Sequence, residues 1–240
     1  MEKILRFLPL ILLEKWAPTR HSHTVFANAS SYLRDGEMIH EDPSVPSALL
    51  RMNDGVAVKM FPNKGTLMTI MRGLLKQTKA HKQHKSACTI AALGLHTPAP
   101  LDVLVFSPRG KYESAYLYEF LEDARDFLDV FTQAEMAQRQ AMLDQLAKEL
   151  VVMAKEGVLF IDFHLSNIMV DVQGEIWWID PEVKTSTSYV KARFWQRMHR
   201  MHTKCNPDVL NDQEWQAFQT TLQREIESAG LRIDPLLNTR

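Results

Sequence analysis

The chain has 240 residues, a length at which one domain or two small lobes can bury a core. Hydrophobic residues make up 45% of it and charged residues 24%, which argues against a disordered chain, a collagen-like fibre and a coiled coil. The net charge of -1 provides no overall attraction to nucleic acid, and we expect no nucleic-acid partner. Two cysteines, Cys88 and Cys205, are too few for a disulfide framework and favour a cytoplasmic protein.

An apolar run from Ile4 to Leu13 lies near the N-terminus. Arg6 and Pro9 interrupt it, so that it is too short for a membrane span, and no small-residue cleavage site follows it. Two interpretations stay open. The run packs on the core, or it rests on a membrane surface and gives the protein a peripheral contact with the inner membrane.

The first half of the chain alternates between strand-like and helical patterns. In chain order, we expect strands over 25–62, one or two helices over 65–93, and strands over 103–106 and 115–120. Asp54 and Gly55 lie between two apolar runs, which predicts a hairpin whose second strand carries Lys59. Pro98 ends the helical region because proline cannot continue a helix.

The second half is richer in helix. The expected elements are a helix over 133–156, short strands over 158–161, 168–170 and 176–179, and helices over 189–204 and 211–228. Thr132 and Glu135 have the spacing of a capping box at the start of the first of these helices. The change in character near residue 122 predicts a lobe over 1–121 and a second lobe over 122–240, with a ligand cleft between them.

Three side chains of the second half suit phosphoryl transfer. Asp162 follows an apolar strand, Asn167 comes five residues later before another strand, and Asp180 ends a third strand. A hairpin of this kind delivers all three to one edge. There, one carboxylate can orient an attacking hydroxyl and take its proton, while the amide oxygen and the second carboxylate hold Mg²⁺ against nucleotide phosphates. The alternative is an ordinary hairpin with turn-forming Asp and Asn residues.

The order of these residues resembles the catalytic loop and metal-binding segment of the protein-kinase-like fold. His164, two residues after Asp162, is typical of the small-molecule branch of that fold, and Val56-Ala57-Val58-Lys59 is similar to the strand that carries the nucleotide lysine. The resemblance implies an ATP- and Mg²⁺-dependent kinase with an α+β, two-lobed fold: a small antiparallel-sheet lobe and a mainly helical lobe. It implies catalytic roles for Asp162 and His164, and metal ligands in Asn167, Asp180 and Glu182. His164 alternatively has a purely structural role.

Two further stretches resemble bacterial lipopolysaccharide core kinases of the WaaP/InaA type. These are Ala91–Leu101 and Tyr116–Glu122, the second continued by Ala124-Arg125-Asp126. Those enzymes phosphorylate Kdo or heptose of the inner core, which implies an anionic sugar or glycolipid acceptor here. The second stretch is similar to their hinge, so the resemblance implies that Glu119 and Leu121 bind the nucleotide together with Lys59.

Among the departures of the sequence from this pattern, two concern the catalytic loop and the nucleotide lysine. Phe160 stands where the family has His or Tyr. No Asp or Glu occurs between Gly55 and Leu101, so the helix glutamate that normally pairs with the nucleotide lysine is missing, and Gln83 aligns with its place. An amide offers an ammonium a hydrogen bond but no ion pair. We therefore expect Lys59 to be held less firmly than in other kinases.

Two basic clusters have either of two roles, a solvated face or a grip on an anionic sugar, phosphate or membrane. The first is expected on one helical face and comprises Arg72, Lys76 and Lys79; the second comprises Lys191, Arg193, Arg197, Arg200 and Lys204. His199, His202 and Cys205 have no second cysteine pair or acidic partner, so we expect no zinc site.

Three functions remain open on the sequence alone. The first is an ATP-dependent sugar kinase of lipopolysaccharide core, which the intact Asp162, Asn167, Asp180 and Lys59 favour. The second is a degenerate kinase-like protein that binds nucleotide or a partner without turnover, which Gln83 favours. The third is a kinase of the same fold with another hydroxyl substrate.

Overall fold

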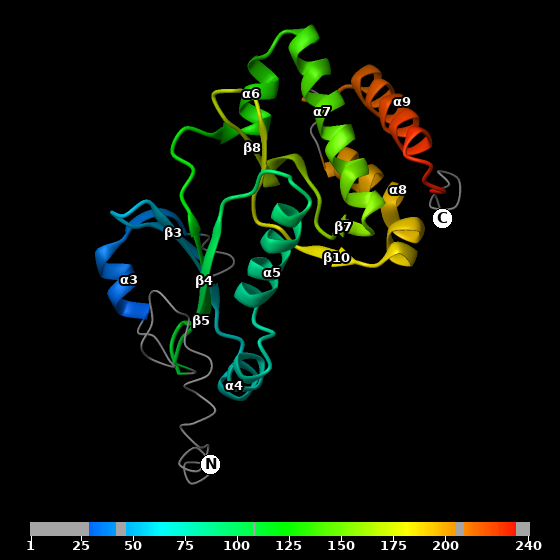
Figure 1. Cartoon of the computed structure of the whole chain (residues 1–240). Coiled ribbons are helices and arrows are strands. Elements are labelled where there is room, and N and C mark those ends of the chain that lie inside the picture. The colour runs from blue at the N-terminus through cyan, green and yellow to red at the C-terminus, as the bar shows by residue number, and fades with distance from the viewer. Residues whose placement is uncertain (1–28, 42–46, 108, 205–208, 234–240) are drawn as a thin grey trace. The chain divides into compact units, whose positions relative to one another are not determined.

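The computed structural model describes residues 29–41, 47–107, 109–204 and 209–233 (Figure 1). The chain divides into two compact units. The first comprises residues up to Lys85 and Ala99–Phe120, and the second comprises Ser86–Pro98 and the residues from Leu121 onward. The chain therefore crosses between the units three times. The apolar run Ile4–Leu13 and Cys205 lie outside the described residues.

The first unit is built on a five-stranded antiparallel sheet in the order β1-β2-β3-β5-β4. Its elements in chain order are α3 (Ala29–Asp35), β1 (Glu37–Glu41), β2 (Ala48–Arg51), β3 (Val56–Pro62), α4 (Thr66–Leu74), the first half of α5 (Lys79–Ala92), β4 (Pro100–Val105) and β5 (Tyr112–Glu119). The predicted hairpin joins β2 to β3. Gly55 has φ 75°, which a glycine adopts without strain, and the Met52 amide donates to the Val56 carbonyl at 2.8 Å.

The expectation of strands throughout 25–62 is wrong for residues 29–35, which form α3. Ala29 and Tyr32 both pack against the core of the sheet. Their spacing of three residues places them on one side of a helix, whereas in a strand they would point to opposite faces. The helix is therefore favoured by packing, which local strand propensity did not reveal.

The two faces of the sheet are covered differently. Val58 and Met60 belong to the core that Ala29 and Tyr32 cover. Alternation along β3 places Lys59 on the other face, with Ala57 and Phe61. Helix α5 covers this second face: Lys79 lies over the Phe61 ring at 5.5 Å, and His84 meets the Tyr116 ring edge-on, with centroids 6.1 Å apart.

The predicted helical region over 65–93 forms two helices, α4 and α5. Helix α4 packs closely on β4, because a Cβ added at Gly73 would lie 3.2 Å from Val105 Cγ1. The chain then turns through Lys76, which has φ 51°. Since α4 ends at Leu74 and α5 begins at Lys79, the expectation that Arg72, Lys76 and Lys79 share one helical face is wrong.

The second unit is mainly helical. From Leu121 onward, its elements are β6 (Arg125–Asp126), α6 (Phe127–Gln133), α7 (Met136–Lys155), β7 (Val158–Phe160), the 3₁₀-helix η1 (Leu165–Asn167), β8 (Ile168–Val170), β9 (Ile176–Trp178), β10 (Val183–Thr185), α8 (Thr187–Lys204) and α9 (Asp212–Ser228). Strands β6, β8 and β9 form one small antiparallel sheet, and β7 pairs with β10 in another. A stripe of buried residues along α7, including Leu143, Leu146 and Leu150, anchors the core of this unit.

The segment Ser86–Pro98 is tied to the β8–β9 hairpin. The Thr97 hydroxyl donates to the Trp178 carbonyl at 2.8 Å, and the Trp178 amide donates to the His96 carbonyl at 2.9 Å. Farther along the chain, the Val183 amide donates to Ser86 Oγ at 3.1 Å. These bonds place the second half of α5 and the loop after it with the helical unit.

The expected α+β architecture, with an antiparallel-sheet unit and a mainly helical unit, is confirmed. A division of domains at residue 121 stays a prediction. Among the described residues, no helix is both long enough and apolar enough to cross a membrane.

Candidate active site

Asp162 follows two residues after Phe160, the last residue of β7, and the packing of Phe160 in the core fixes the backbone there. Phe160 is buried, and its ring packs against Phe163 and Trp178, with centroids 6.4 and 5.2 Å away. The Ile161 amide donates to the Glu182 carbonyl at 2.7 Å and extends the β7–β10 pairing by one residue. Asp162 itself is half exposed. A buried aromatic anchor therefore holds the backbone, while the carboxylate faces outward.

Hydrogen bonds within the loop join Asp162 to Asn167. The Asn167 amide nitrogen Nδ2 donates to the Asp162 main-chain carbonyl at 3.1 Å, and its backbone N–H donates to the His164 carbonyl at 3.0 Å. The His164 Nδ1 atom lies 2.6 Å from Ser166 Oγ. Burial lowers the pKa of His164, against the opposing effect of the nearby Asp162 carboxylate. Burial therefore favours the neutral form of the His164 ring.

Asp180 is brought to the same loop by the β8–β9 hairpin. Ile168 pairs with Trp178 in that hairpin, and the Ile179 amide donates to the Asn167 carbonyl at 3.0 Å. Asp180 follows with φ 49°, in the left-handed region that few residues other than glycine and Asn or Asp adopt. Strain of this kind is retained in folded proteins where the surroundings fix a functional side chain.

The donor set of this loop fits a hard divalent cation. The Nδ2 atom of Asn167 donates to the backbone, so Oδ1 is the side-chain atom that could bind a cation. Asp180 and Glu182 contribute carboxylates from the segment after β9. Mg²⁺ commonly takes one or two protein carboxylates and completes its shell with water and substrate phosphates. Two or three oxygen donors are therefore sufficient here.

His199 and His202 both pack against one aromatic ring. The His202 ring stacks on Trp215 with centroids 4.4 Å apart and planes inclined by 4°, and His199 meets the same ring edge-on. Within the described residues, no group of three or more His, Cys, Asp or Glu side chains is arranged to hold a metal ion. The two histidines therefore have a packing role.

Two basic residues of α8 reach Asp162. Lys204 Nζ lies 3.0 Å and Arg200 Nη2 lies 3.6 Å from Asp162 Oδ1, while His164 Nε2 lies 3.9 Å from Oδ2. The hydrogen bond from Lys204 holds the pKa of Asp162 below its ordinary value. The sequence showed a basic cluster on this helix. The contact of Lys204 with Asp162, about forty positions earlier in the chain, has no local pattern that could reveal it.

The expected nucleotide-binding residues divide between the units. Lys59 lies in the middle of β3, where it pairs with Leu49 of β2 and Tyr116 of β5. Gln83 projects from α5 and is 4% exposed; within the described part of the chain its Oε1 atom has no hydrogen-bond partner. Glu119 ends β5, and its amide donates to the Ala99 carbonyl at 3.1 Å. Leu121 is the first residue of the second unit after the crossing.

The sheet unit, the helical unit and the order of Lys59, Asp162, Asn167 and Asp180 place the chain in the class of protein-kinase-like folds. The model of the lipopolysaccharide kinase (Kdo/WaaP) family matches residues 65–221, more than half of the chain. The chain therefore belongs to the lipopolysaccharide kinase (Kdo/WaaP) family. The recognition from sequence is confirmed.

Individual relatives are distant. The 3-deoxy-D-manno-octulosonic acid kinase of Vibrio parahaemolyticus serotype O3:K6 (strain RIMD 2210633) is 24% identical over 105 residues, which make up 44% of this chain and 43% of that protein. The bifunctional kinase-methyltransferase WbdD is 17% identical, with 75% of this chain and 42% of that chain covered and a TM-score of 0.44. The Cydia pomonella granulovirus kinase PK-1 is 14% identical, with coverages of 65% and 55% and a TM-score of 0.42. This chain thus spans less than half the length of the curated relative that it matches.

Proposed function

We propose that the protein is an ATP- and Mg²⁺-dependent phosphotransferase that acts on a sugar hydroxyl of lipopolysaccharide inner core, in Kdo or heptose. The observation that carries the proposal is the loop in which Asn167 Nδ2 binds the Asp162 carbonyl and the Asn167 carbonyl binds the Ile179 amide. This loop joins the candidate base to Asn167 and Asp180, two of the candidate metal ligands. Membership of a kinase family that acts on this class of molecule supports the choice of acceptor.

Each residue has a role that follows from its chemistry. Asp162 accepts a hydrogen bond from the acceptor hydroxyl, orients its oxygen and takes the proton late in the transfer. Asn167 and Asp180 would hold Mg²⁺, with Glu182 as a further ligand, and the metal would supply positive charge against the nucleotide phosphates. Lys59 supplies a positive charge for the α- and β-phosphates, and the hinge at Glu119 and Leu121 binds the base of the nucleotide. His164 steadies the loop or approaches the γ-phosphate.

The direct test is transfer of labelled phosphate from ATP to purified core oligosaccharide in the presence of Mg²⁺. We expect Asp162→Ala to reduce turnover by about 10²–10⁴-fold, the usual contribution of a positioned base, with little change in ATP affinity. Asp129→Ala, which removes an exposed carboxylate of α6, is the matched control and retains full turnover. Collapse of ATP affinity in Asp162→Ala would show a structural role for this residue.

Gln83 favours a second candidate, a kinase-like protein that binds nucleotide without turnover. The resemblance aligns Gln83 with the carboxylate that pairs with the nucleotide lysine in an active kinase, and its buried oxygen has no hydrogen-bond partner among the described residues. If the parent protein binds Mg²⁺–ATP and transfers phosphate to no core acceptor, this candidate replaces the first. Transfer to another hydroxyl compound but not to core would keep the kinase and change its substrate.

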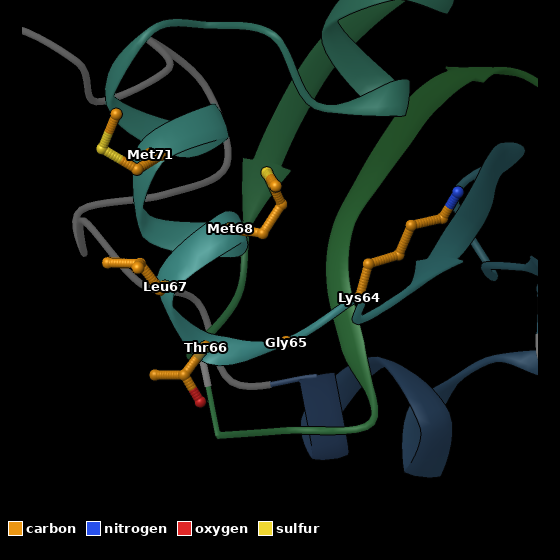
Figure 2. Close-up of a pocket in the computed structure, with 6 residues that line it drawn as sticks. All are labelled: Lys64, Gly65, Thr66, Leu67, Met68 and Met71. Carbon is orange, nitrogen blue, oxygen red and sulfur yellow. The ribbon is translucent and has the colours of Figure 1, made fainter.

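We further propose a peripheral membrane contact through α4. Leu67, Met71 and Leu75 are exposed on this helix and its end, and Figure 2 shows Leu67 and Met71 projecting from its outer side. Residues Lys64–Met68 and Met71 line an open cavity of about 480 Å³. Exposed lysines, Lys64 and Lys76, flank the helix, and no acidic residue occurs between Gly55 and Leu101. An exposed apolar face with basic ends suits an anionic lipid surface.

A further inference from the structure

Arg200 and Lys204 converge on one oxygen of the candidate catalytic carboxylate. They lie four residues apart on α8, so that both face the same side of the helix. Lys204 Nζ lies 3.0 Å and Arg200 Nη2 lies 3.6 Å from Asp162 Oδ1. The three side chains are between 39% and 51% exposed, so an incoming ligand can reach them. Other basic residues of α8 are engaged elsewhere: Arg197 donates to the Tyr189 hydroxyl, and Arg193 donates to Gln196.

Stability alone does not account for this arrangement. Exposed ion pairs contribute little to stability, because water already solvates both partners. Two cations beside a base also oppose its task, since they bind one of its two oxygens, Oδ1, and make the carboxylate a weaker base. The arrangement is useful if the acceptor brings a second anion into the site, because that anion can then bind Arg200 and Lys204 in place of Asp162.

We propose that Arg200 and Lys204 bind the carboxylate of an acidic sugar acceptor and thereby select a sugar acid over a neutral sugar. The proposal rests on the proposed function and names the group of the acceptor that is recognised. A guanidinium matches the two oxygens of a carboxylate, and an ammonium adds a further charge-assisted hydrogen bond. The ring of a sugar acid carries both a carboxylate and hydroxyls, so one end can be held on α8 while a hydroxyl reaches Asp162.

Binding of the carboxylate also prepares the base. As Arg200 and Lys204 turn to the acceptor, Asp162 Oδ1 becomes available to the hydroxyl. In the transfer, the hydroxyl oxygen forms a bond to the γ-phosphorus, the bond from that phosphorus to the bridging oxygen breaks, and its electron pair leaves with ADP. The hydroxyl proton passes to Asp162. A neutral sugar carries no anion that could bind the two cations. Asp162 therefore stays paired with Arg200 and Lys204 when the hydroxyl of a neutral sugar arrives.

The test compares core oligosaccharide that retains its sugar carboxylate with the same oligosaccharide after reduction of the carboxyl group to an alcohol. We expect Arg200→Gln and Lys204→Met each to raise KM for the acidic acceptor by about 10–100-fold, the range for a lost charge-assisted hydrogen bond, with KM for ATP unchanged. Reduction of the acceptor should impair the parent by a similar factor and the variants much less. Arg193→Gln and Lys191→Met, on the same helix, are matched controls that leave both KM values unchanged.

A second measurement needs no turnover. Titration of the parent protein with free 3-deoxy-D-manno-octulosonic acid should show binding that Lys204→Met weakens and Lys191→Met does not. Equal acceptor KM in Lys204→Met and parent would overturn the inference while turnover of the parent still supported the kinase. A rise in KM for ATP alone would also overturn it, because the cations would then serve the γ-phosphate. Absence of phosphate transfer by the parent would instead contradict the proposed function.

Discussion

Asp180 combines an unusual backbone conformation with a predicted metal-binding role. Asn tolerates the left-handed region about as well as Asp does, so Asp180→Asn keeps the backbone while removing the negative charge that a hard cation requires. We expect this variant to lose Mg²⁺-dependent ATP binding, measured by calorimetry, with the melting temperature of the protein alone nearly unchanged. Equal Mg²⁺–ATP affinity in variant and parent would contradict the assignment.

Asp171 is a suitable control for that substitution. It lies in the turn after β8, and its carboxylate accepts the indole N–H of Trp177 at 2.9 Å and the amides of Gln173 and Glu175 at the same distance. Asp171→Asn should therefore weaken three hydrogen bonds of the turn and reduce stability by about 1 kcal/mol. It should leave Mg²⁺–ATP affinity intact. The two aspartates thus separate a metal effect from a stability effect.

Lys59 and Gln83 test how the nucleotide lysine is held. Lys59 lies on the face of the sheet that α5 covers, and Gln83 is a buried residue of that helix whose Oε1 atom has no hydrogen-bond partner in the part of the chain that the structure describes. A carboxylate there would hold an ammonium more strongly than an amide does. We expect Gln83→Glu to leave phosphate transfer unchanged or raise it, and Lys59→Ala nearly to abolish it, in the labelled-ATP assay. A loss of transfer in Gln83→Glu, with its fold intact by circular dichroism, would contradict this role.

At the scale of single residues, the sequence identified the candidates but not all of their contacts. Asp162, Asn167 and Asp180 were predictable because they are close in sequence and their order is typical of one chemistry. The main-chain partners of Asn167 are likewise local. Lys204 was recognised only as part of a basic cluster, because its partner is reached through the packing of α8 on the core. Contacts that arise from tertiary packing follow no regular spacing in the sequence, so the sequence alone does not predict them.

Helix α4 exposes the large apolar side chains Leu67, Met68 and Met71 to solvent. Leu67→Ser combined with Met71→Ser removes two exposed apolar side chains and leaves the buried Thr69 and Gly73 in place. We expect this variant to bind phosphatidylglycerol vesicles about tenfold more weakly in co-sedimentation, since each side chain loses the free energy of burial in the interface. The matched control is Val172→Ser, an equally exposed position of the second unit, which leaves binding unchanged.

Two outcomes would contradict a lipid contact of α4. Equal vesicle binding by parent and variant would exclude the helix as the contact. Equal binding of the parent to phosphatidylglycerol vesicles and to zwitterionic phosphatidylcholine vesicles would exclude the role of the lysines. A lower melting temperature of the double variant without vesicles would show that the protein itself covers these side chains.

The secondary structure was predictable where several local patterns agreed. The hairpin at Asp54-Gly55 and the long apolar stripe of α7 are confirmed, because turn chemistry and periodicity both act within a few residues. The capping box expected from Thr132 and Glu135 is wrong: the Thr132 hydroxyl donates to the Leu128 carbonyl, and Glu135 makes no side-chain cap. A capping box does occur at α9, between Asn211 and Glu214. Strand β6 has only two residues, and β10 has one apolar residue among three, so neither has the apolar run by which the other short strands were predicted.

At the scale of the whole molecule, the α+β class was predictable from the order of strand-rich and helix-rich stretches. The placement of Ser86–Pro98 in the second unit was not. It depends on hydrogen bonds between residues about eighty positions apart, from Thr97 to Trp178. The helical pattern of α5 gives no sign of the point where the helix passes from one unit to the other, because the backbone of the helix is continuous through that point.

These three crossings limit how the gene can be divided. A fragment that begins at residue 121 lacks the His96 carbonyl and the Thr97 hydroxyl that bind Trp178, and a fragment that ends at residue 120 carries both groups without their partner. A single recombination event within the gene therefore cannot exchange either unit intact between two members of the family. The helical unit can be exchanged between homologues only together with residues 86–98, or the new protein has to restore those hydrogen bonds by compensating substitutions.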